Sequence, residues 1–352
     1  MCGIIGYVGT KDAMPIIVDG LKRLEYRGYD SAGIAIRDAG GIKVVKRKGR
    51  LAELTAELAQ TPLGGSVGIG HTRWATHGEP SDANSHPHLS SGGRIAVVHN
   101  GIIENYKQLK ERLETHGVVF ASQTDSEVVA QLAEHYYEGN LLECVIKVAN
   151  ALEGSYALGI MCQNEPDILV AVKKDNPLIV GVSEQGNFIA SDVPAILLHT
   201  NQVYYMNDGE IAVLTKDGAD FFNMDKELLE KTAETISWSV DSAEKGGYPH
   251  FMLKEIMEQP KILRDTIASA AASDVINMID IAKFSKIVIT ACGSAYNAGV
   301  VGKYVFEQLG RISVEVELAS EFRYKDPIVD NKTLVILVSQ SGETADTIAA
   351  MR

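Results

Sequence analysis

The residue best suited to chemical reaction is Cys2, which directly follows the initiator methionine in the opening run MCGIIG. Removal of Met1 would leave one residue carrying both a thiol and a free α-amino group. These groups titrate near pH ~8.5 and ~8, so the amine can serve the thiol as a general base at neutral pH. Position alone does not separate this arrangement from a cysteine placed beside the start by chance. The apolar, glycine-containing run that follows is typical of a buried strand, which would order the terminus.

A thiolate that attacks an amide or ester carbonyl needs hydrogen-bond donors already in place for the oxyanion. The run His99-Asn100-Gly101 follows an apolar, strand-like segment and would present the Asn100 amide and the Gly101 N–H in one loop. Asn-Gly is equally typical of a tight hairpin turn, and the pair by itself favours the turn. An amino-acid substrate also needs a cation and an anion for its two charged groups. Arg73 and Asp125 have those charges, although each alone fits an ordinary surface position.

Histidines are concentrated between residues 71 and 99 and raise a competing interpretation as a metal site. No helical HxxxH pair is present, and the His-Pro-His run falls in a polar loop, so we expect no bound metal. No nicotinamide or pyridoxal motif is present either, and we expect no cofactor. The histidines concerned are His71, His77, His86, His88 and His99.

The composition describes an ordinary globular protein of 352 residues, long enough for two or three domains, with 45% hydrophobic and 22% charged residues. A formal net charge of −13 argues against nucleic-acid or anionic-membrane partners, but not against small anionic substrates. We find no transmembrane segment and no secretion signal. The four cysteines are scattered, which favours reduced thiols and a cytoplasmic location. They are Cys2, Cys144, Cys162 and Cys292.

Short β-branched runs dominate the first two-thirds of the chain, with helical stretches grouped between them. Strands and helices grouped in this way favour a layered α+β domain over alternating βαβ units. The expected strands are 34–36, 66–70, 95–98, 157–161, 168–172, 178–181, 188–191 and 203–206. The expected helices are 13–24, 106–116, 126–137 and 141–151.

Residues 235–249 lose periodicity and accumulate glycine, which indicates an interdomain linker. Beyond it strands alternate strictly with helices, as in a doubly wound parallel sheet. The sequence stops inside the helix expected after the third strand, which would leave an apolar face uncovered, so we expect a fragment of a longer protein. The expected elements are a helix over 250–271, strands over 287–290, 314–318 and 334–338, and a helix over 296–309.

Two loops rich in hydroxyls and glycine follow strands of this second domain, and each opens a helix. They are residues 291–295 (ACGSA) and 339–344 (SQSGET). Hydroxyls and backbone N–H groups at a helix N-terminus suit a phosphate, and open α/β sheets bind ligands at the carboxyl ends of their strands. One such loop alone is typical of helix capping. Two after strands of one sheet favour a ligand, and neither is a nucleotide P-loop.

Two family resemblances follow from longer motifs. CGIIGYVG, LEYRGYDSAG, HTRWATHGEPS, HPH, VVHNGIIEN and TDSE, spanning residues 2–127, resemble the glutaminase domain of the N-terminal-nucleophile (class II) amidotransferases. ACGSAYNAG, ELASEFRY and VSQSGETADT resemble the SIS (sugar isomerase) phosphosugar-binding domain. The resemblances imply an α+β four-layer αββα Ntn-hydrolase sandwich over 1–238, a linker with connecting helices over 239–282, and the incomplete start of an α/β parallel-sheet SIS domain over 283–352.

The first resemblance implies roles for single residues. Cys2 would attack the side-chain amide of glutamine, and Asn100 with Gly101 would form the oxyanion hole. Arg73 and Asp125 would hold the carboxylate and the amino group of glutamine.

Four further glutamine-site residues are implied in the same way. Thr76 and His77 would contact the substrate from their loop, and Arg27 would support the terminus of the nucleophile. Trp74 would be an aromatic gate between the ammonia-producing and acceptor sites; without the resemblance it fits a packed loop aromatic equally well.

The second resemblance implies a site for fructose 6-phosphate. Ala295 departs from the serine common in that family, which removes about one hydrogen bond, of order ~1 kcal/mol. The residues implied to bind the sugar phosphate are Ser294, Ser339, Gln340, Ser341 and Thr344.

Together the resemblances imply an aminotransferase that hydrolyses L-glutamine and passes the ammonia to fructose 6-phosphate, giving glucosamine 6-phosphate, with a homodimer as the full-length protein. The family's second sugar domain, which carries the isomerase residues, is not in this sequence, so we expect the chain to retain only the glutaminase half. The alternatives are a glutaminase that serves another acceptor, as in phosphoribosylamine synthesis, and a non-catalytic phosphosugar-binding protein.

Overall fold

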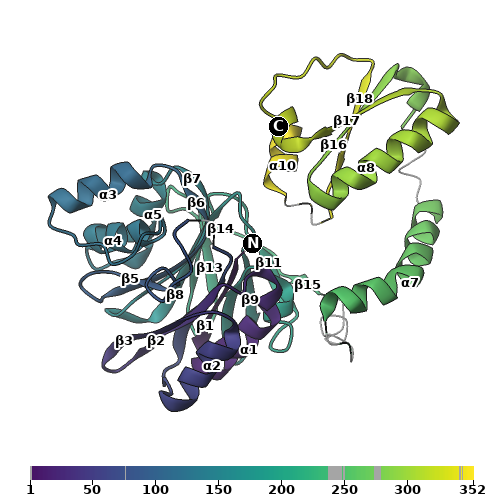
Figure 1. Ribbon diagram of the computed structural model, residues 1–352. Helices are drawn as coiled ribbons and strands as arrows, with labels where there is room; N and C mark the ends of the chain where they lie inside the picture. The colour runs from purple at the N-terminus through teal and green to yellow at the C-terminus, as the bar shows by residue number, and fades with distance from the viewer. Residues whose placement is uncertain are drawn as a thin grey trace. The chain divides into compact units, whose positions relative to one another are not determined.

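The computed structural model describes residues 2–75, 77–236, 248, 250–272, 279–340, 342 and 344–352. The chain divides into two compact units, Met1–Glu244 and Lys245–Arg352, and each is described by itself (Figure 1). The predicted boundary at 238/239 and most of the predicted linker lie outside the described residues.

The first unit contains two antiparallel sheets. The larger has the order β15 (Glu234–Thr235), β11 (Gln202–Tyr205), β9 (Ile179–Ser183), β10 (Gly186–Ala190), β1 (Gly3–Gly9), β4 (Val67–Arg73), β2 (Ser31–Asp38), β3 (Gly41–Lys48). The smaller has the order β14 (Leu228–Leu229), β13 (Ala219–Phe222), β12 (Ile211–Leu214), β8 (Glu165–Lys174), β7 (Gly154–Cys162), β6 (Ile95–Ile103), β5 (His88–Leu89).

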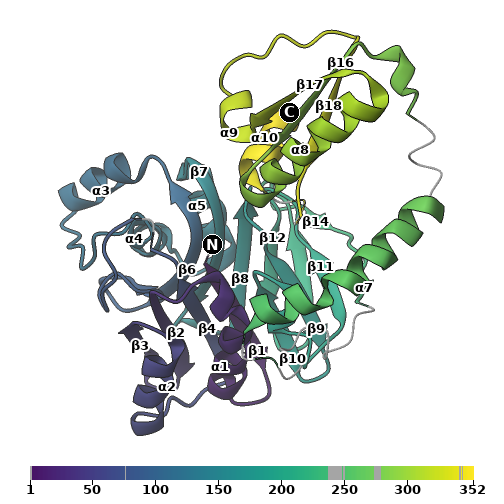
Figure 2. The same ribbon diagram turned by 45° about the vertical axis from the view of Figure 1, so that its right-hand side comes forward.

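Helices cover the outer face of each sheet (Figures 1 and 2). Helices α1 (Ala13–Leu24) and α2 (Leu51–Gln60) share a buried apolar cluster with the larger sheet. Helices α3 (Tyr106–Thr115), α4 (Glu127–Tyr136) and α5 (Leu141–Ala151) share another with the smaller sheet. A third cluster lies between the two sheets. The predicted four-layer αββα sandwich is therefore confirmed. Short 3-10 turns, η1 (Glu25–Arg27) and η2 (Val193–Ala195), complete this unit.

Strand β1 explains why the opening run of the chain is apolar throughout. Side chains alternate between the faces of a strand; Ile5 and Tyr7 join the cluster under the helices, while Ile4 and Val8 join the cluster between the sheets. Both faces are buried, so no polar residue is tolerated. At Gly6 an added Cβ would lie 2.7 Å from Ile189, in the neighbouring strand β10. It would lie 2.8 Å from Leu169, in strand β8 of the facing sheet, so glycine allows the two sheets to approach.

In the first unit, the sequence predicted the strands and helices with long apolar runs and missed several elements that are more polar or shorter. The predicted strands and helices of the first unit correspond to β2, β4, β6–β11 and α1, α3–α5. Strand β3 and helix α2 were not predicted; β3 is half-exposed and reads GIKVVKRK, and its pairing with β2 comes from a hairpin contact. Strands β12–β15 were also missed; each has only two to four residues, so the apolar pattern along it is short.

The second unit has a parallel sheet, as predicted. Its strand order is β17 (Ser313–Leu318), β16 (Lys286–Ala291), β18 (Thr333–Val338). Helix α8 starts at Gly293, three residues before the predicted start, because the glycine-serine loop is its first turn. The remaining elements are α7 (Phe251–Ala272), η4 (Ile281–Lys283), α8 (Gly293–Val305), the π-turn η5 (Phe306–Gly310), α9 (Ala319–Phe322) and α10 (Ala345–Met351). None of the described helices is long and apolar enough to cross a membrane.

Packing at Gly6 gives a stability prediction. Gly6→Ala introduces a methyl group between the sheets and should lower the free energy of unfolding by about 1–3 kcal/mol, the usual cost of overpacking. Urea denaturation measures the change. Gly64→Ala is the matched control, because an added Cβ there meets nothing within 4 Å. An equal effect of the two substitutions would contradict the packing account.

Candidate active site around Cys2

Cys2 lies immediately before β1, and two backbone segments approach it. Its Sγ accepts a hydrogen bond from the Trp74 N–H (3.2 Å) and lies 3.5 Å from the Trp74 carbonyl oxygen, to which the thiol donates. The Asn100 side-chain amide donates from Nδ2 to the Cys2 carbonyl oxygen at 3.0 Å. The structure thus brings Cys2 together with the ends of β4 and β6, two of the segments that the sequence singled out.

The surroundings of Cys2 disfavour the thiolate. Burial raises the pKa of the Cys2 thiol, and the hydrogen bond from the Trp74 N–H and the charge of Arg73 offset only part of that effect. The thiol therefore stays protonated at neutral pH and needs a base within reach to become a nucleophile.

The Asn100-Gly101 pair is not a hairpin turn, so that interpretation is wrong, and the pair is not in a loop. Strand β6 runs through both residues, with Asn100 opposite Ala157 and Gly101 opposite Tyr156 of β7. Gly101 has a φ of +128°, and an added Cβ would lie 2.0 Å from the Ser155 carbonyl oxygen. Only glycine fits this position within the strand.

Three groups hold the amide of Asn100. His71 Nε2 lies 2.9 Å from Oδ1, and Nδ2 donates to Ser191 Oγ at 2.9 Å as well as to the Cys2 carbonyl. Ser191 Oγ also accepts the Ile4 N–H at 2.8 Å, which ties the start of β1 to the residue after β10. Sequence reasoning did not select Ser191 or give His71 this contact, because both depend on pairing between distant strands.

Arg73 and Asp125, the predicted partners of an amino acid, are both buried. Arg73 Nη2 donates to the carbonyl oxygens of His77 and Gly78, while Nη1 is buried and has no hydrogen-bond partner among the described residues. Asp125 Oδ2 accepts the Ile103 N–H at 2.8 Å. The opposite charges act on each other, since Asp125 is among the groups that raise the pKa of Arg73 against the dominant lowering by desolvation.

Two other residues of the predicted glutamine site, His77 and Trp74, make ring contacts with tyrosines. The His77 ring packs edge-on against Tyr106, with centroids 4.8 Å apart. The Trp74 side chain is 43% exposed and packs edge-on against Tyr29, with centroids 5.3 Å apart. Thr76 lies outside the described residues.

Arg27 is engaged by a carboxylate that the sequence did not single out. Its Nη2 donates to Asp192 at 2.7 Å, and the Tyr26 hydroxyl donates to the same carboxylate oxygen at 2.5 Å. Burial together with the Asp192 charge raises the pKa of Tyr26 to about 12. Arg27 therefore anchors the turn after α1 to the residue that follows Ser191.

The turn after Arg27 holds the backbone that contacts Cys2. Asp30 accepts the Ala75 N–H at 2.8 Å and donates its own N–H to the Arg73 carbonyl oxygen at 3.0 Å. An added Cβ at Gly28 would lie 2.6 Å from the Arg73 carbonyl carbon and 2.8 Å from the Trp74 nitrogen. The glycine in the YRGYD run permits this close approach.

Four of the clustered histidines form a buried layer behind the site. His71 and His86 stack with centroids 4.2 Å apart, and His88 and His99 lie on the other sides of His86. Desolvation lowers the pKa of His71 to about 3 and keeps the pKa values of the other three below the usual range. The described residues contain no group of three or more His, Cys, Asp or Glu side chains able to hold a metal ion.

The second unit brings the two predicted sugar-phosphate loops to one edge of its sheet. Strands β16 and β18 pair in parallel with Ala291 opposite Val338, so Ser294 and Ser339 follow neighbouring strand ends. Ser339 Oγ accepts the Gly342 N–H at 3.0 Å and lies 3.2 Å from Thr344 Oγ1. Gln340 and Ser294 are exposed. Ser341 lies outside the described residues.

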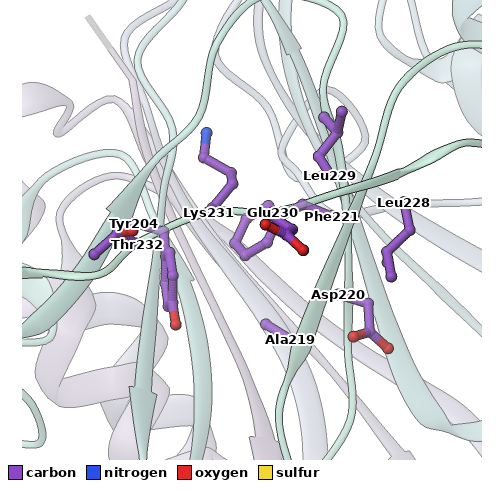
Figure 3. A pocket seen from close by; sticks show the side chains of 9 residues that line it. All are labelled: Tyr204, Ala219, Asp220, Phe221, Leu228, Leu229, Glu230, Lys231 and Thr232. Carbon is purple, nitrogen blue, oxygen red and sulfur yellow. The ribbon is translucent and has the colours of Figure 1, made fainter.

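A surface cavity of about 520 Å³ lies elsewhere on the first unit. None of the predicted site residues lines it (Figure 3). Its lining comes from β11, β13, β14 and the segment after β14. The lining residues are Tyr204, Ala219, Asp220, Phe221, Leu228, Leu229, Glu230, Lys231 and Thr232.

Family models match both units. A glutamine amidotransferase domain matches residues 71–198, and a SIS domain matches residues 280–352. The first match includes Arg73, Asn100, Asp125 and Ser191, and the second includes both hydroxyl-rich loops.

Curated relatives match the whole chain. Glutamine–fructose-6-phosphate aminotransferases (isomerizing) are 58% identical in Clostridium acetobutylicum, 56% in Caldanaerobacter subterraneus and 47% in Thermus thermophilus. Each alignment covers 100% of this chain. The chain belongs to this aminotransferase family. It spans 59% of the length of these relatives.

Solved structures share the fold of this aminotransferase chain. The glutamine phosphoribosylpyrophosphate amidotransferase from B. subtilis aligns with a TM-score of 0.57 at 22% identity, covering 94% of this chain and 69% of that one. At that identity the likeness speaks for the fold alone.

The buried histidines predict how stability depends on pH. Their folded-state pKa values lie below the unfolded value near ~6.5, so unfolding takes up protons below that pH. Their stabilising contribution is complete above about pH 6.5 and is lost as pH falls toward the folded pKa, at up to ~1.4 kcal/mol per pH unit for each histidine. Urea denaturation between pH 7 and 5.5 should show this decline.

Two variants separate the histidine layer from other titrating groups. His88→Gln keeps an amide for the 2.9 Å contact with Thr124 but cannot titrate, and should make the decline shallower. His135→Gln alters an exposed histidine and should leave the slope unchanged. Equal slopes in wild type and His88→Gln would contradict the assignment.

Proposed function

We propose that the chain hydrolyses L-glutamine with the Cys2 thiol as nucleophile. The observation that carries the proposal is the juxtaposition at the start of β1, where Cys2 meets the Trp74 backbone and the Asn100 amide. The family supports it, because its members are named as glutamine-dependent aminotransferases.

The first step needs a base, since burial raises the pKa of the Cys2 thiol. With Met1 removed, the α-amino group of Cys2 takes the thiol proton while sulfur attacks the amide carbon. The same proton then goes to the leaving nitrogen, which departs as ammonia and leaves a γ-glutamyl thioester. Water attacks the thioester, with the amine again accepting a proton, and glutamate is released with the thiol regenerated.

The tetrahedral oxyanion formed in each step needs donors. Asn100 Nδ2 already points at the Cys2 carbonyl, so an oxygen bound beside Sγ would share or replace that acceptor. The Gly101 N–H is the second donor of the proposed oxyanion hole, on a backbone that only glycine can adopt. One such donor is worth about 10²–10³-fold in kcat.

We assign the α-amino and α-carboxylate groups of the substrate to Arg73, Asp125 and the loop that follows Arg73. Arg73 Nη1, buried without a partner among the described residues, is the donor for the α-carboxylate. Asp125 is the acceptor for the α-ammonium group, and His77 and Thr76 belong to the same substrate loop. We assign the exposed Trp74 ring to the gate over the site and Arg27 to support of the terminal segment.

We assign the second unit to the acceptor, fructose 6-phosphate, and the whole reaction to formation of glucosamine 6-phosphate and glutamate. The relatives' names and the two loops at one sheet edge support this. The residues assigned to the sugar phosphate are Ser294, Ser339, Gln340, Ser341 and Thr344. A homodimer and a cytoplasmic location remain predictions.

The nucleophile is tested directly. Cys2→Ala should lower glutamate release from glutamine by at least about 10³-fold, since the covalent route is lost. A coupled glutamate assay measures it, with intact mass checking that Met1 is absent. Cys144→Ala, which removes a buried thiol of α5, is the control and should keep the activity. Unchanged release by Cys2→Ala would contradict the mechanism.

The carboxylate assignment predicts a selective effect of Arg73. Arg73→Gln should raise the KM for glutamine about 10- to 100-fold, as expected for loss of a charge-assisted pair. Hydrolysis of a γ-amide that lacks the α-carboxylate should be equally slow in wild type and variant. Arg94→Gln, which removes the same charge from an exposed pair with Glu134, is the matched control. An equal loss on both substrates would contradict the role.

A further inference from the structure

We propose that His71 is a positioning residue that fixes the orientation of the Asn100 amide, so that its NH2 group faces Cys2. The proposal rests on the proposed glutaminase function and adds a residue to that site which the sequence treated only as part of a possible metal cluster.

The contacts of His71 Nε2 determine its protonation. The nitrogen lies 3.0 Å from the His99 carbonyl oxygen and 2.9 Å from the Asn100 side chain. A carbonyl oxygen only accepts hydrogen bonds, so Nε2 carries the proton and donates. The Asn100 atom that faces this donor must then be the amide oxygen. A reversed amide would set two N–H donors against each other.

The other end of the amide is fixed as well. Nδ2 has two protons, and its two acceptors are the Cys2 carbonyl oxygen at 3.0 Å and Ser191 Oγ at 2.9 Å. Among the described residues, His71 is the only donor to Oδ1. The hydrogen bond from His71 therefore holds the oxygen end of the amide, in the same orientation that the Cys2 carbonyl favours at the nitrogen end.

The sheet holds the His71 ring rigidly enough for this task. His71 lies in β4 opposite Ile4 of β1 and Gly33 of β2, and its side chain is fully buried. The ring stacks on His86 with an interplanar angle of 19°. Desolvation lowers the pKa of His71 to about 3, so the ring is neutral throughout the physiological range with its single proton on Nε2.

Loss of the donor should harm catalysis without loss of the fold. Without it the amide oxygen is buried and unsatisfied, and rotation of the amide by 180° would turn that oxygen toward the forming oxyanion. The loss of kcat cannot exceed the loss caused by removing the Asn100 amide itself. His71→Phe should therefore lower kcat about 10- to 100-fold with little change in KM. His71→Gln places an amide N–H near the position of Nε2 and should retain kcat within about five-fold of wild type.

A double-mutant cycle with Asn100→Ala tests whether His71 acts through Asn100. If it does, His71→Phe lowers kcat in the wild-type background but not in the Asn100→Ala background. An equal loss in both backgrounds overturns the proposal, because it would mean an effect independent of the amide. If His71→Phe does not fold, a folded His71→Gln variant that loses more than 100-fold overturns it instead.

A second measurement separates this proposal from the proposed function. Nuclear magnetic resonance with asparagine-selective 15N labelling reports the two Asn100 amide protons in the resting chain, without any turnover. These signals should shift in His71→Phe and stay close to wild type in His71→Gln. Unchanged signals in a folded His71→Phe overturn the positioning role. Absence of Cys2-dependent glutamate release in wild type overturns the glutaminase function. The NMR signals would then still test whether His71 orients the Asn100 amide.

Discussion

The placement of β1 in the interior of the larger sheet is the constraint on which the site depends. This strand pairs with β10 on one side and β4 on the other, and both of its faces are buried. Chain termini are ordinarily mobile. Here seven paired residues deliver the preceding residue, Cys2, to a fixed point beside Trp74 and Asn100. The position of Cys2 is fixed because the strand that follows it is paired on both sides.

The same pairing brings the supporting groups to Cys2 from segments far away in sequence. Strand β4 supplies Arg73 and the Trp74 backbone at its end, β10 is followed by Ser191 and Asp192, and β6 from the opposite sheet supplies Asn100 and Gly101. The hydrogen bond between Asn100 Nδ2 and Ser191 Oγ joins the two sheets at this point. The site is therefore located where the two sheets of the sandwich are tied together by polar contacts.

Burial and nearby polar groups have opposite effects on the pKa of the Cys2 thiol, which burial raises and the Trp74 N–H and Arg73 lower. Desolvation raises the pKa of the Cys2 thiol and lowers those of the histidines behind it, so burial favours neutral groups here. A neutral His71 with its proton on Nε2 is suited to hold an amide without adding charge near Cys2. Charged groups also lie nearby: the charge of Arg73 lowers the pKa of the Cys2 thiol and that of Asp30 raises it.

The sequence by itself determined the elements with strong local signals. Apolar runs predicted β1, β4, β6–β11 and the helices that cover them, and motif types singled out Cys2, Arg73, Asn100 and Asp125. The same local reasoning placed Asn100-Gly101 in a turn or a loop, whereas strand β6 continues through it, because pairing with β7 outweighs the local preference of the dipeptide.

The tertiary structure alone decided which side chains meet. Ser191 and Asp192 lie in none of the motifs, and Asp30 lies in LEYRGYDSAG without a role of its own being implied; each acts through contacts with residues more than 40 positions away. The histidines of residues 71–99 looked like possible ligands in sequence, but burial and stacking made them a neutral layer, one member of which contacts the Asn100 amide. The physical reason is that strand register sets side-chain neighbours, and register is a property of pairs of strands that no single stretch of sequence contains.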